Sequence, residues 1–269
     1  TEIMGPRDHF ATRLGFILAA AGSAVGLGNI WKFPFMAGQN GGGAFLIIYL
    51  AFVLTIGFSV MLAEFTIGRA GQRNPVGAFR ALKGGPWPAV GGLGVAAGFV
   101  ILSFYSVVGG WTLAYAIKAA TGALASNDPE TLGAAFGAFI SEPEGVIGFH
   151  TLFMVLTGGI IAGGVQGGIE RASRILMPVL VILVIVLAGR AVTLEGAAKG
   201  IDFFLTPDFS KVTWGTVNAA LGQAFFSLSL GMGAMLTYAS YLDKQVNLPK
   251  TAAQVTILDT TFAVIAGFM

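Results

Sequence analysis

Seven apolar stretches, each long enough to cross a bilayer, limit what this chain can fold into. A helix needs about 20 mostly apolar residues to cross the hydrocarbon core of a membrane. Stretches of this kind cover residues 14–38, 44–68, 89–121, 146–164, 175–192, 215–241 and 251–269. Only 10% of the 269 residues are charged and the mean hydropathy is +0.80, whereas a soluble domain carries about 25% charged residues. We therefore predict an all-α, multi-pass membrane protein whose surroundings are the lipid bilayer.

The positive charges predict which side of the membrane each loop faces. If the N-terminus is cytoplasmic, ten of the 15 Lys and Arg residues lie on the inner side, namely Arg7, Arg13, Arg69, Arg73, Arg80, Lys83, Arg171, Arg174, Lys244 and Lys250. The other five are Lys32, Lys118, Arg190, Lys199 and Lys211. Because short cytoplasmic loops carry an excess of Lys and Arg, we predict a cytoplasmic N-terminus. The net charge of +2 gives no reason to expect nucleic acid as a partner, and the lack of cysteine excludes disulfides and Cys-ligated metals.

The first and sixth stretches each contain a cluster of glycines with polar neighbours. The first cluster runs from Gly22 to Asn29 and is followed by Pro34, and the second runs from Ser227 to Gly233. Each glycine costs about 1 kcal/mol in a helix interior, and two explanations compete: close packing of helices, or local unwinding. We favour unwinding, because Ser and Asn accompany the glycines and the clusters lie five spans apart, at matching places in two five-helix repeats.

Unwinding creates a binding site by simple electrostatics. The new helix N-termini present unpaired N–H groups and partial positive charge, which suit a carboxylate. The carbonyl groups released at the helix C-termini suit a hard cation such as Na⁺. Non-helical backbone at membrane depth persists only where it lines a cavity or is buried in protein. The two clusters therefore predict a site that binds an anionic substrate group together with Na⁺.

Two acidic residues lie inside apolar stretches, Glu64 in the second and Asp259 in the seventh. A charge at mid-membrane costs at least about 2.5–3.5 kcal/mol on insertion scales, so each is a candidate functional residue. Asp259 has no cation nearby in the sequence and is predicted to ligate an ion; the alternative is a protonated, hydrogen-bonded carboxyl group. Glu64 precedes Arg69 by about a turn. It forms either an ion pair near the inner surface or hydrogen bonds to N–H groups released in a broken helix.

The aromatic residues allow two readings each, and enzyme motifs are absent from the sequence. Tyr105 is a candidate to donate its hydroxyl to a substrate carboxylate, and Phe226 and Met232 flank the second glycine cluster; all three are equally compatible with ordinary packing. The glycines of the first cluster have neither Rossmann nor P-loop spacing, and no Gly-x-Ser-x-Gly motif occurs. We therefore expect neither an enzyme nor an organic cofactor.

These residues resemble those of bacterial neurotransmitter:sodium symporters with the LeuT-type fold. The matching stretches are 7–15 (RDHFATRLG), 24–34 (AVGLGNIWKFP), 40–45 (NGGGAF), 168–171 (GIER), 205–209 (LTPDF) and 226–233 (FSLSLGMG). The resemblance implies an inverted-repeat fold in the bacterial inner membrane. Its parts are a cytoplasmic gate segment at 1–13, a first five-helix repeat at 14–193, an extracellular loop at 194–214 and the start of a second repeat at 215–269. Members of the family have more than seven spans, so we expect the sequence to be the front part of a longer transporter.

The resemblance also implies two Na⁺ sites. The first is formed by the Ala24 carbonyl, the Asn29 side chain, Ser227 and Asp259, and is completed by the substrate carboxylate. The second uses the Gly22 and Val25 carbonyls, with its other ligands expected on an eighth helix. Many members carry Asn at the position of Asp259, and chloride-dependent relatives add an anion near it. We hypothesise that Asp259 supplies that negative charge and makes the protein chloride-independent.

For the substrate, the resemblance implies an amino acid. Its carboxylate meets the Leu27 and Gly28 N–H groups and the Tyr105 hydroxyl, and its amine meets carbonyl groups of the two broken spans. The residues assigned to the whole substrate pocket are Ala24, Leu27, Gly28, Ile101, Tyr105, Phe226, Ser227, Ser229, Gly231 and Met232. Because the border of this pocket is mostly apolar, we predict a hydrophobic amino acid, with bulky and aromatic ones admitted.

Three further residues are assigned by the resemblance to gating and bracing. Arg7 belongs to the cytoplasmic gate, Lys32 to the outer gate, where the family often has Arg, and Glu64 braces the broken helices. The predicted function is a Na⁺-coupled symporter that takes up the amino acid by alternating access. A membrane module that binds its ligand without transport is the main alternative. A channel is the third, but it requires a ring of like charges that the sequence does not contain.

Overall fold

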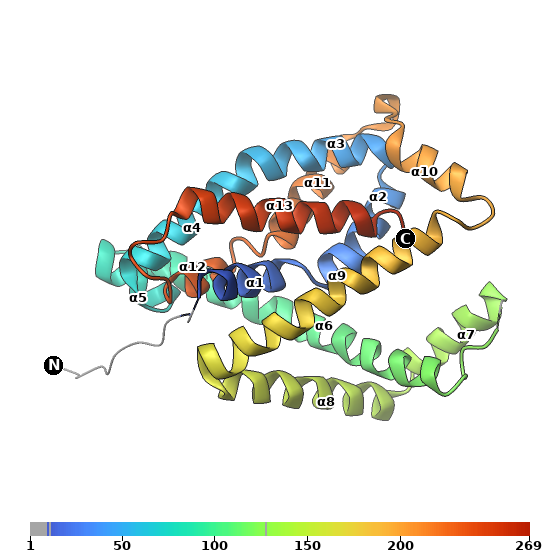
Figure 1. The fold of residues 1–269 in the computed structure, drawn as a ribbon, viewed down its shortest axis with the longest axis horizontal. Helices are drawn as coiled ribbons and strands as arrows, with labels where there is room; N and C mark the ends of the chain where they lie inside the picture. Colours follow the sequence, from blue (N-terminus) through green and yellow to red (C-terminus); the bar gives the residue numbers. More distant parts are fainter. Residues whose placement is uncertain (1–9, 11, 127) are drawn as a thin grey trace.

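The computed structural model describes residue 10, residues 12–126 and residues 128–269, which fold into a bundle of helices (Figure 1). In chain order the elements are α1 (Arg13–Ala24), η1 (Gly28–Lys32), α2 (Phe33–Gln39), α3 (Gly43–Phe52), η2 (Val53–Gly57), α4 (Phe58–Gly71), α5 (Pro75–Leu82), α6 (Pro88–Ala120), α7 (Pro129–Ile140), α8 (Pro143–Ala162), η3 (Val165–Glu170), α9 (Arg171–Ala191), α10 (Ala197–Leu205), η4 (Phe209–Lys211), α11 (Trp214–Ser227), α12 (Ala234–Ala239) and α13 (Leu248–Ala266). The turns η1, η2 and η3 are π-helical, and η4 is a 3₁₀ turn. Helices α5 and α12 lie at one end of the bundle, and α7 and α10 at the other.

The seven predicted spans are present as helices or as pairs of helices. Four continuous helices are long and apolar enough to cross a membrane: Gly43–Gly71, Pro88–Ala120, Pro143–Ala162 and Val165–Ala191. The pair Leu14–Ala24 and Gly28–Gln39, bent by 45°, makes a fifth. The sixth predicted span corresponds to α11 and α12, and the seventh to α13. These two fall short of a continuous apolar helix because the sixth is interrupted over 228–233 and the seventh carries Asp259 among several polar residues.

The fifth span and the loop after it differ from the sequence-based boundaries. The helix runs continuously from Val165, through η3, to Ala191, whereas the sequence predicted a start at 175. The pair Gly167–Gly168 lies within the π-helical turn η3, so it does not end the helix. The predicted extracellular loop at 194–214 contains a helix of its own, α10.

Local sequence sets the start of three connecting and spanning helices. Asn74 and Asp128 stand directly before Pro75 and Pro129, and Asn247 stands two residues before a proline. Each of these Asn or Asp side chains accepts hydrogen bonds from backbone N–H groups two or three residues further on. Such a cap satisfies groups that a helix start leaves unpaired, and proline fits the first turn because its missing N–H has no partner there.

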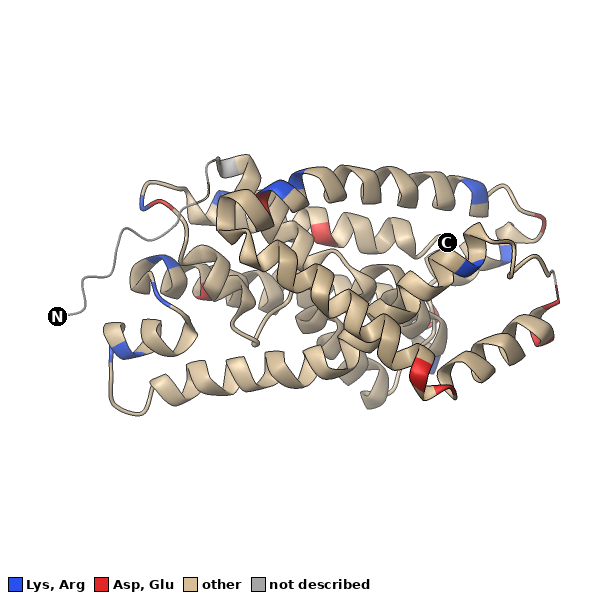
Figure 2. Ribbon diagram, turned by 90° about the horizontal axis from the view of Figure 1, so that it is seen from below, with Lys and Arg blue, Asp and Glu red and all other residues tan. Residues whose placement is uncertain are grey.

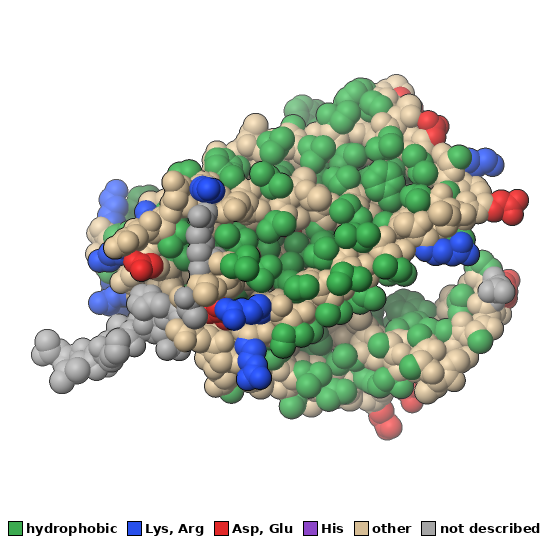
Figure 3. All heavy atoms as spheres, in the orientation of Figure 1, with side chains coloured by type: hydrophobic (Ala, Val, Ile, Leu, Met, Phe, Trp, Pro, Cys, Tyr) green, Lys and Arg blue, Asp and Glu red, His purple; other side chains and the backbone are tan. Residues whose placement is uncertain are grey.

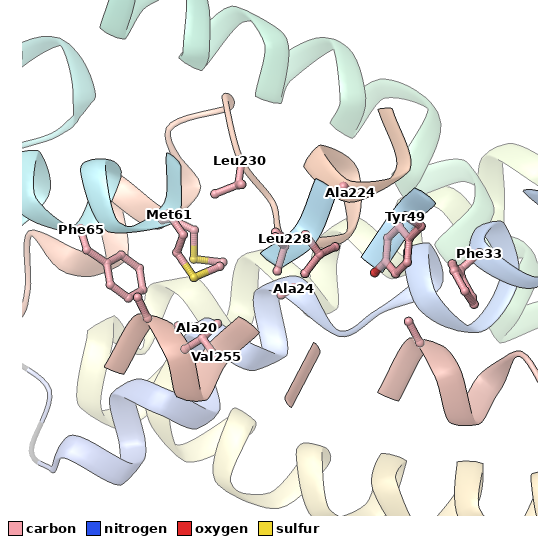
Figure 4. Close-up of a cluster of buried hydrophobic side chains, with 14 of the residues drawn as sticks. Ala20, Ala24, Phe33, Tyr49, Met61, Phe65, Ala224, Leu228, Leu230 and Val255 are labelled. Atoms are coloured by element: carbon pink, nitrogen blue, oxygen red, sulfur yellow. The ribbon is translucent and has the colours of Figure 1, made fainter. Parts of the chain in front are cut away.

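The core of the bundle is a cluster of buried apolar side chains that lies against the sixth span (Figure 4). The Phe33 ring packs on Tyr49 with 4.9 Å between centroids, and Met61 and Phe65 extend the cluster along α4. Leu228 and Leu230, which belong to no helix, are 0% and 5% exposed within it. The core therefore holds the non-helical part of the sixth span in place by burying its leucines.

Helices α6 and α8 form an outer layer of the bundle. Glycines of α6 allow close approach, since a Cβ atom added at Gly110 would lie 2.7 Å from the His150 backbone nitrogen. No described residue of α8 is buried. Figure 3 shows a face that is largely hydrophobic, with charged side chains mainly toward its ends. An apolar girdle of this kind suits the lipid environment that the sequence predicts.

Candidate functional site

The first glycine cluster forms an unwound segment between two helical parts. Helix α1 ends at Ala24, Val25 is extended (φ −77°, ψ 106°), and helical structure resumes at Gly28. The Leu27 N–H, released from helical bonding, donates to the Tyr105 hydroxyl on α6 at 3.0 Å. The predicted unwinding of the first span is confirmed.

The second glycine cluster is also unwound, over the six residues between Ser227 and Ala234. Ser229, Gly231 and Gly233 have φ angles of 54°, 79° and 73°, in the region that is strained for residues other than glycine. The Ser229 hydroxyl donates to the Ser23 carbonyl at 2.8 Å. The one strained non-glycine residue of this segment therefore links the second break to the end of α1.

Glu64, on α4, supplies hydrogen-bond acceptors to the second break. Its two carboxylate oxygens accept from the Gly231 N–H at 2.7 Å and from the Leu236 N–H at 3.3 Å. Arg69 instead donates to the carbonyls of Val246 at 2.5 Å and Lys244 at 3.3 Å. Of the two alternatives for Glu64, the structure thus contains hydrogen bonds to N–H groups of the broken span.

Asp259 lies at the centre of a buried polar cluster contributed by three helices. It is 0% exposed. One carboxylate oxygen accepts from Asn29 Nδ2 at 2.8 Å, and the other accepts from the Ser227 hydroxyl at 2.7 Å. Asn29 Nδ2 also lies 3.2 Å from Ser227 Oγ and from the Asp259 carbonyl oxygen. The sequence places these residues 32 to 230 positions apart, and the fold brings them into one cluster.

This cluster has the chemistry of a site for a hard cation. It brings together the Asp259 carboxylate, the Ser227 hydroxyl and the Asp259 carbonyl oxygen at buried positions, close to the unwound part of the first span. Within the described ranges there is no group of three or more His, Cys, Asp or Glu residues that could hold a metal ion. The donor set therefore fits Na⁺ better than a transition metal, which favours nitrogen and sulfur ligands.

Aromatic rings cover the two breaks from the side of α6. The rings of Tyr105 and Phe226 are 6.2 Å apart, and Lys32 Nζ lies 3.8 Å from the centroid of the Phe226 ring. A Cβ atom at Gly28 would lie 3.1 Å from the Phe226 ring. Phe226 therefore joins the first break to the predicted outer-gate residue Lys32 through a cation–π contact.

Two further glycines of α6 lie against the second break. A Cβ atom at Gly94 would lie 3.3 Å from the Gly231 carbonyl oxygen, and one at Gly98 would lie 3.4 Å from that of Met232. Ile101 and Tyr105 follow on the same helix at intervals of three and four residues, which continue this face. The predicted pocket residues of α6 and of the sixth span are thus adjacent.

The residues predicted for a second Na⁺ site lie on a separate cleft. It has a volume of about 760 Å³, is lined mainly by apolar side chains of α1, α6, α8 and α9, and includes Gly22, Val25 and Leu27. Tyr105 lines the same cleft, so it borders both this space and the unwound segment. Asn29, Ser227 and Asp259 are not among the residues that line this cleft.

Sequence reasoning missed two polar residues of the buried cluster. Gln223 is 1% exposed, donates from Nε2 to the Gly28 carbonyl at 2.9 Å, and its Oε1 has no hydrogen-bond partner among the described residues. The Tyr49 hydroxyl donates to Ser227 Oγ at 3.3 Å. Gln223 had a signal, since it precedes Ser227 by four residues on an apolar helix and so shares its face. Tyr49 had none, because only tertiary contact places it there.

Of the segment 1–13, predicted to be a cytoplasmic gate, the structure describes only the last residues. Arg7 lies outside the described residues. Further along the chain, the Thr12 hydroxyl donates to Glu170 Oε1 at 3.2 Å. The Arg174 guanidinium forms an ion pair with the same oxygen at 2.5 Å. Glu170 is 2% exposed, and Gly15 leaves the space that its side chain fills. Glu170 thus ties the start of α1 to α9, a role that the sequence did not indicate.

Known proteins are similar in sequence to this chain over nearly its whole length. The sodium:neurotransmitter symporter family matches residues 7–131 and 142–269. An uncharacterised sodium-dependent transporter of Bacillus subtilis, YhdH, is 45% identical over 96% of this chain and 58% of its own length. A sodium-dependent neutral amino acid transporter of mouse, SLC6A17, is 29% identical over 97% of this chain and 40% of its own. The chain therefore spans little more than half of YhdH and less than half of the mouse protein.

A solved structure matches the fold closely. The crystal structure of MhsT in complex with L-phenylalanine has a TM-score of 0.93 and 52% sequence identity, over 98% of this chain and 60% of that one. This likeness confirms the predicted all-α, LeuT-type fold with broken first and sixth helices.

The contacts of Glu64 predict a loss of stability when its side chain is removed. In Glu64→Ala, the N–H groups of Gly231 and Leu236 lose a charged acceptor, and each such bond contributes about 1.5–3 kcal/mol. We expect a clearly lower thermal unfolding temperature for the detergent-solubilised protein. The control is Glu144→Ala, an exposed acid at the start of α8, which should change stability by no more than about 0.5 kcal/mol. Equal unfolding temperatures for the two variants would contradict the bracing role.

Proposed function

The chain belongs to the sodium:neurotransmitter symporter family, and we propose that it carries the substrate and Na⁺ sites of a Na⁺-coupled amino acid transporter. The observation that carries the proposal is the meeting of two unwound helices at one buried carboxylate. Asp259 accepts hydrogen bonds from Asn29 beside the first break and from Ser227 at the start of the second. In this proposal residues 14–193 are the first repeat and 215–269 the start of the second. The N-terminus is cytoplasmic, and the membrane is the bacterial inner membrane.

We assign the first Na⁺ site to the Ala24 carbonyl, Asn29, Ser227 and Asp259. Na⁺ is a co-transported substrate in this proposal. In the buried cluster, Asn29 and Ser227 offer N–H and O–H donors to the carboxylate, and both also carry an oxygen that can turn toward a cation. Burial supports strong cation binding, since a carboxylate interacts more strongly with a cation where water is excluded. The Gly22 and Val25 carbonyls are assigned to a second Na⁺ site.

The substrate carboxylate is assigned to the first break. There the Leu27 N–H donates to the Tyr105 hydroxyl at 3.0 Å, so these two hydrogen-bonding groups lie side by side. The Gly28 N–H is the third group of this subsite, and the start of a helix favours negative charge. Carbonyls near Ala24, Ser227 and Ser229 are assigned to the substrate amine, because the breaks release carbonyls from helical bonding.

The substrate side chain is assigned to the region where α6 faces the second break. Ile101, Phe226 and Met232 supply apolar contacts there, and Gly231 lets the backbone approach. Two comparisons support a hydrophobic substrate: the solved MhsT complex contains L-phenylalanine, and the mouse relative is named a neutral amino acid transporter. We therefore propose a hydrophobic amino acid as the substrate.

Coupling between Na⁺ and substrate follows from shared ligands. A Na⁺ ion that touches both Asp259 and the substrate carboxylate raises the affinity for the substrate, and the substrate raises the affinity for Na⁺ by the same factor. Lys32, above Phe226, is assigned to the outer gate, and Arg7 to the inner gate. Alternating access then requires one helix bundle to move against the other around the site.

A transport experiment tests the proposed function. The full-length protein that contains this chain, reconstituted in proteoliposomes, should accumulate labelled amino acid when an inward Na⁺ gradient is imposed. Asp259→Ala should abolish this uptake, because it removes the only acidic ligand of the cation site. Asp128→Asn, at an exposed helix cap, serves as the control and should leave uptake unchanged. Binding without uptake would instead support a module that holds its ligand but does not transport it.

The charge of Asp259 predicts independence from chloride. If this carboxylate supplies the negative charge beside Na⁺, replacing chloride by gluconate at fixed Na⁺ should leave uptake unchanged. In Asp259→Asn the charge is lost, so any remaining uptake should rise with chloride. A steep rise in uptake by the unmodified protein as chloride is added would overturn this assignment.

The apolar border of the pocket predicts the order of competing substrates. Unlabelled phenylalanine or leucine should displace a labelled hydrophobic amino acid at concentrations at least about tenfold lower than lysine or glutamate. The physical reason is that a buried unpaired charge in the pocket is costly, whereas each buried methylene contributes about 0.8 kcal/mol. Equal or better competition by the charged amino acids in an equilibrium binding assay would refute a hydrophobic pocket.

A further inference from the structure

The connection between α4 and α6 carries positive charge that no acidic residue of the same region offsets. Arg73, Arg80 and Lys83 are all exposed. No Asp or Glu occurs from residue 65 to residue 127. Among the described residues, the ion pairs within 4 Å are Arg174–Glu170 and Lys211–Asp208. The three cations, which we call the basic face of α5, therefore have no carboxylate partner in the described part of the chain.

The basic face lies in and directly beside α5. Arg73 stands two residues before Pro75, where α5 begins, Arg80 lies in its last turn, and Lys83 follows Leu82, where α5 ends. Pro75 and Ala78 are buried against the neighbouring helices. Figure 2 shows ribbon segments in blue, the colour of Lys and Arg, at the end of the bundle that α5 occupies. The three charges thus lie at exposed positions within one short segment of the chain.

The basic face lies where lipid headgroups begin. Helix α4 ends at Gly71 and the spanning helix α6 begins at Pro88, so the short connection stays close to the membrane surface. Trp87 and Leu82 are 41% and 49% exposed, and Lys83 Nζ lies 4.9 Å from the Trp87 ring. Exposed tryptophan next to lysine is the usual composition of a membrane–water interface. Apolar and cationic groups therefore meet at headgroup level.

A neighbouring cation in the last turn of α4 shows what an engaged residue does here. Arg69 donates to the Lys244 and Val246 carbonyls, so its role is internal. No comparable hydrogen bond joins Arg73, Arg80 or Lys83 to the described part of the protein. A tendency to keep cations on the cytoplasmic side explains their sign, but it does not supply the counter-charge that three exposed cations lack here.

We propose that Arg73, Arg80 and Lys83 form a binding surface for the anionic phospholipid headgroups of the inner leaflet. Phosphate oxygens supply the negative charge that the protein lacks here, and each cation near an anionic membrane surface strengthens binding about fivefold. The assignment to the inner leaflet rests on the proposed orientation. Selective binding of anionic lipid by the purified chain does not depend on orientation or on transport.

The helix that carries Arg80 is in contact with the second break. A Cβ atom at Gly233, the last residue of the second break, would lie 2.8 Å from Pro75 Cγ. Pro75 is the first residue of α5 and stands two positions from Arg73. A headgroup bound to the basic face therefore lies next to the helix that packs on the broken span.

Lipid binding to the purified chain tests the proposal directly. Native mass spectrometry in detergent should show phosphatidylglycerol bound at least about tenfold more tightly than phosphatidylcholine. The combined variant Arg73→Gln, Arg80→Gln and Lys83→Gln should lose this preference. The matched control, Arg190→Gln, Lys199→Gln and Lys211→Gln, removes the same charge from exposed positions at the other end and should keep it. Loss of the preference in both variants, or in neither, would overturn the proposal.

Further arms separate the sources of the effect. Arg73→Lys with Arg80→Lys keeps the charge and should keep the preference. Inorganic phosphate should not compete at lipid concentrations; if it does, the surface is a free-anion site and the proposal fails. If the triple variant does not fold, the unmodified chain decides the question. Its preference should vanish at about 1 M salt, where the Debye length is about 3 Å, and a preference that persists there would overturn the proposal.

Discussion

Backbone groups released inside a membrane have no water to bind, so each must find a partner in the protein, at a cost of several kcal/mol if it does not. The two broken helices release such groups side by side. Glu64 accepts from N–H groups of the second break, Tyr105 accepts from Leu27, Gln223 donates to the Gly28 carbonyl, and Ser229 donates to the Ser23 carbonyl. Because these partners come from α4, α6, α11 and the second break, the arrangement of the helices around the site follows from this requirement.

The carboxyl group of Asp259 lies close to the same two breaks. It is fully buried, and its described partners are the neutral side chains of Asn29 and Ser227. These contacts join η1, α11 and α13, so a cation bound there acts on three helices at once. In the proposed mechanism this explains how ion binding affects the substrate subsite a few residues away, on the same unwound segment of α1.

Buried acidic residues have partners within the protein, whereas some exposed basic residues have none among the described residues. In the core, Asp259 and Glu170 are held by hydrogen bonds or an ion pair. In and beside α5, three exposed cations have no carboxylate partner among the described residues, and lipid phosphate is the partner that we propose for them. The contact between Pro75 and Gly233 places α5 beside the broken sixth span. The helix that carries Arg80 therefore packs directly on the proposed site.

The sequence by itself determined the membrane class, the seven spans, the two breaks and the candidate status of Glu64 and Asp259, because hydrophobic length, glycine in mid-span and buried charge are local properties. It left the partner of Glu64 undecided and placed the start of the fifth span ten residues late. It did not indicate that Tyr49 and Gln223 join the Asp259 cluster, or that Glu170 ties α1 to α9. Only the tertiary structure decided these points, because they depend on which helices pack together. A side chain's partner across 100 or more residues is set by that packing and leaves no mark on its own stretch of sequence.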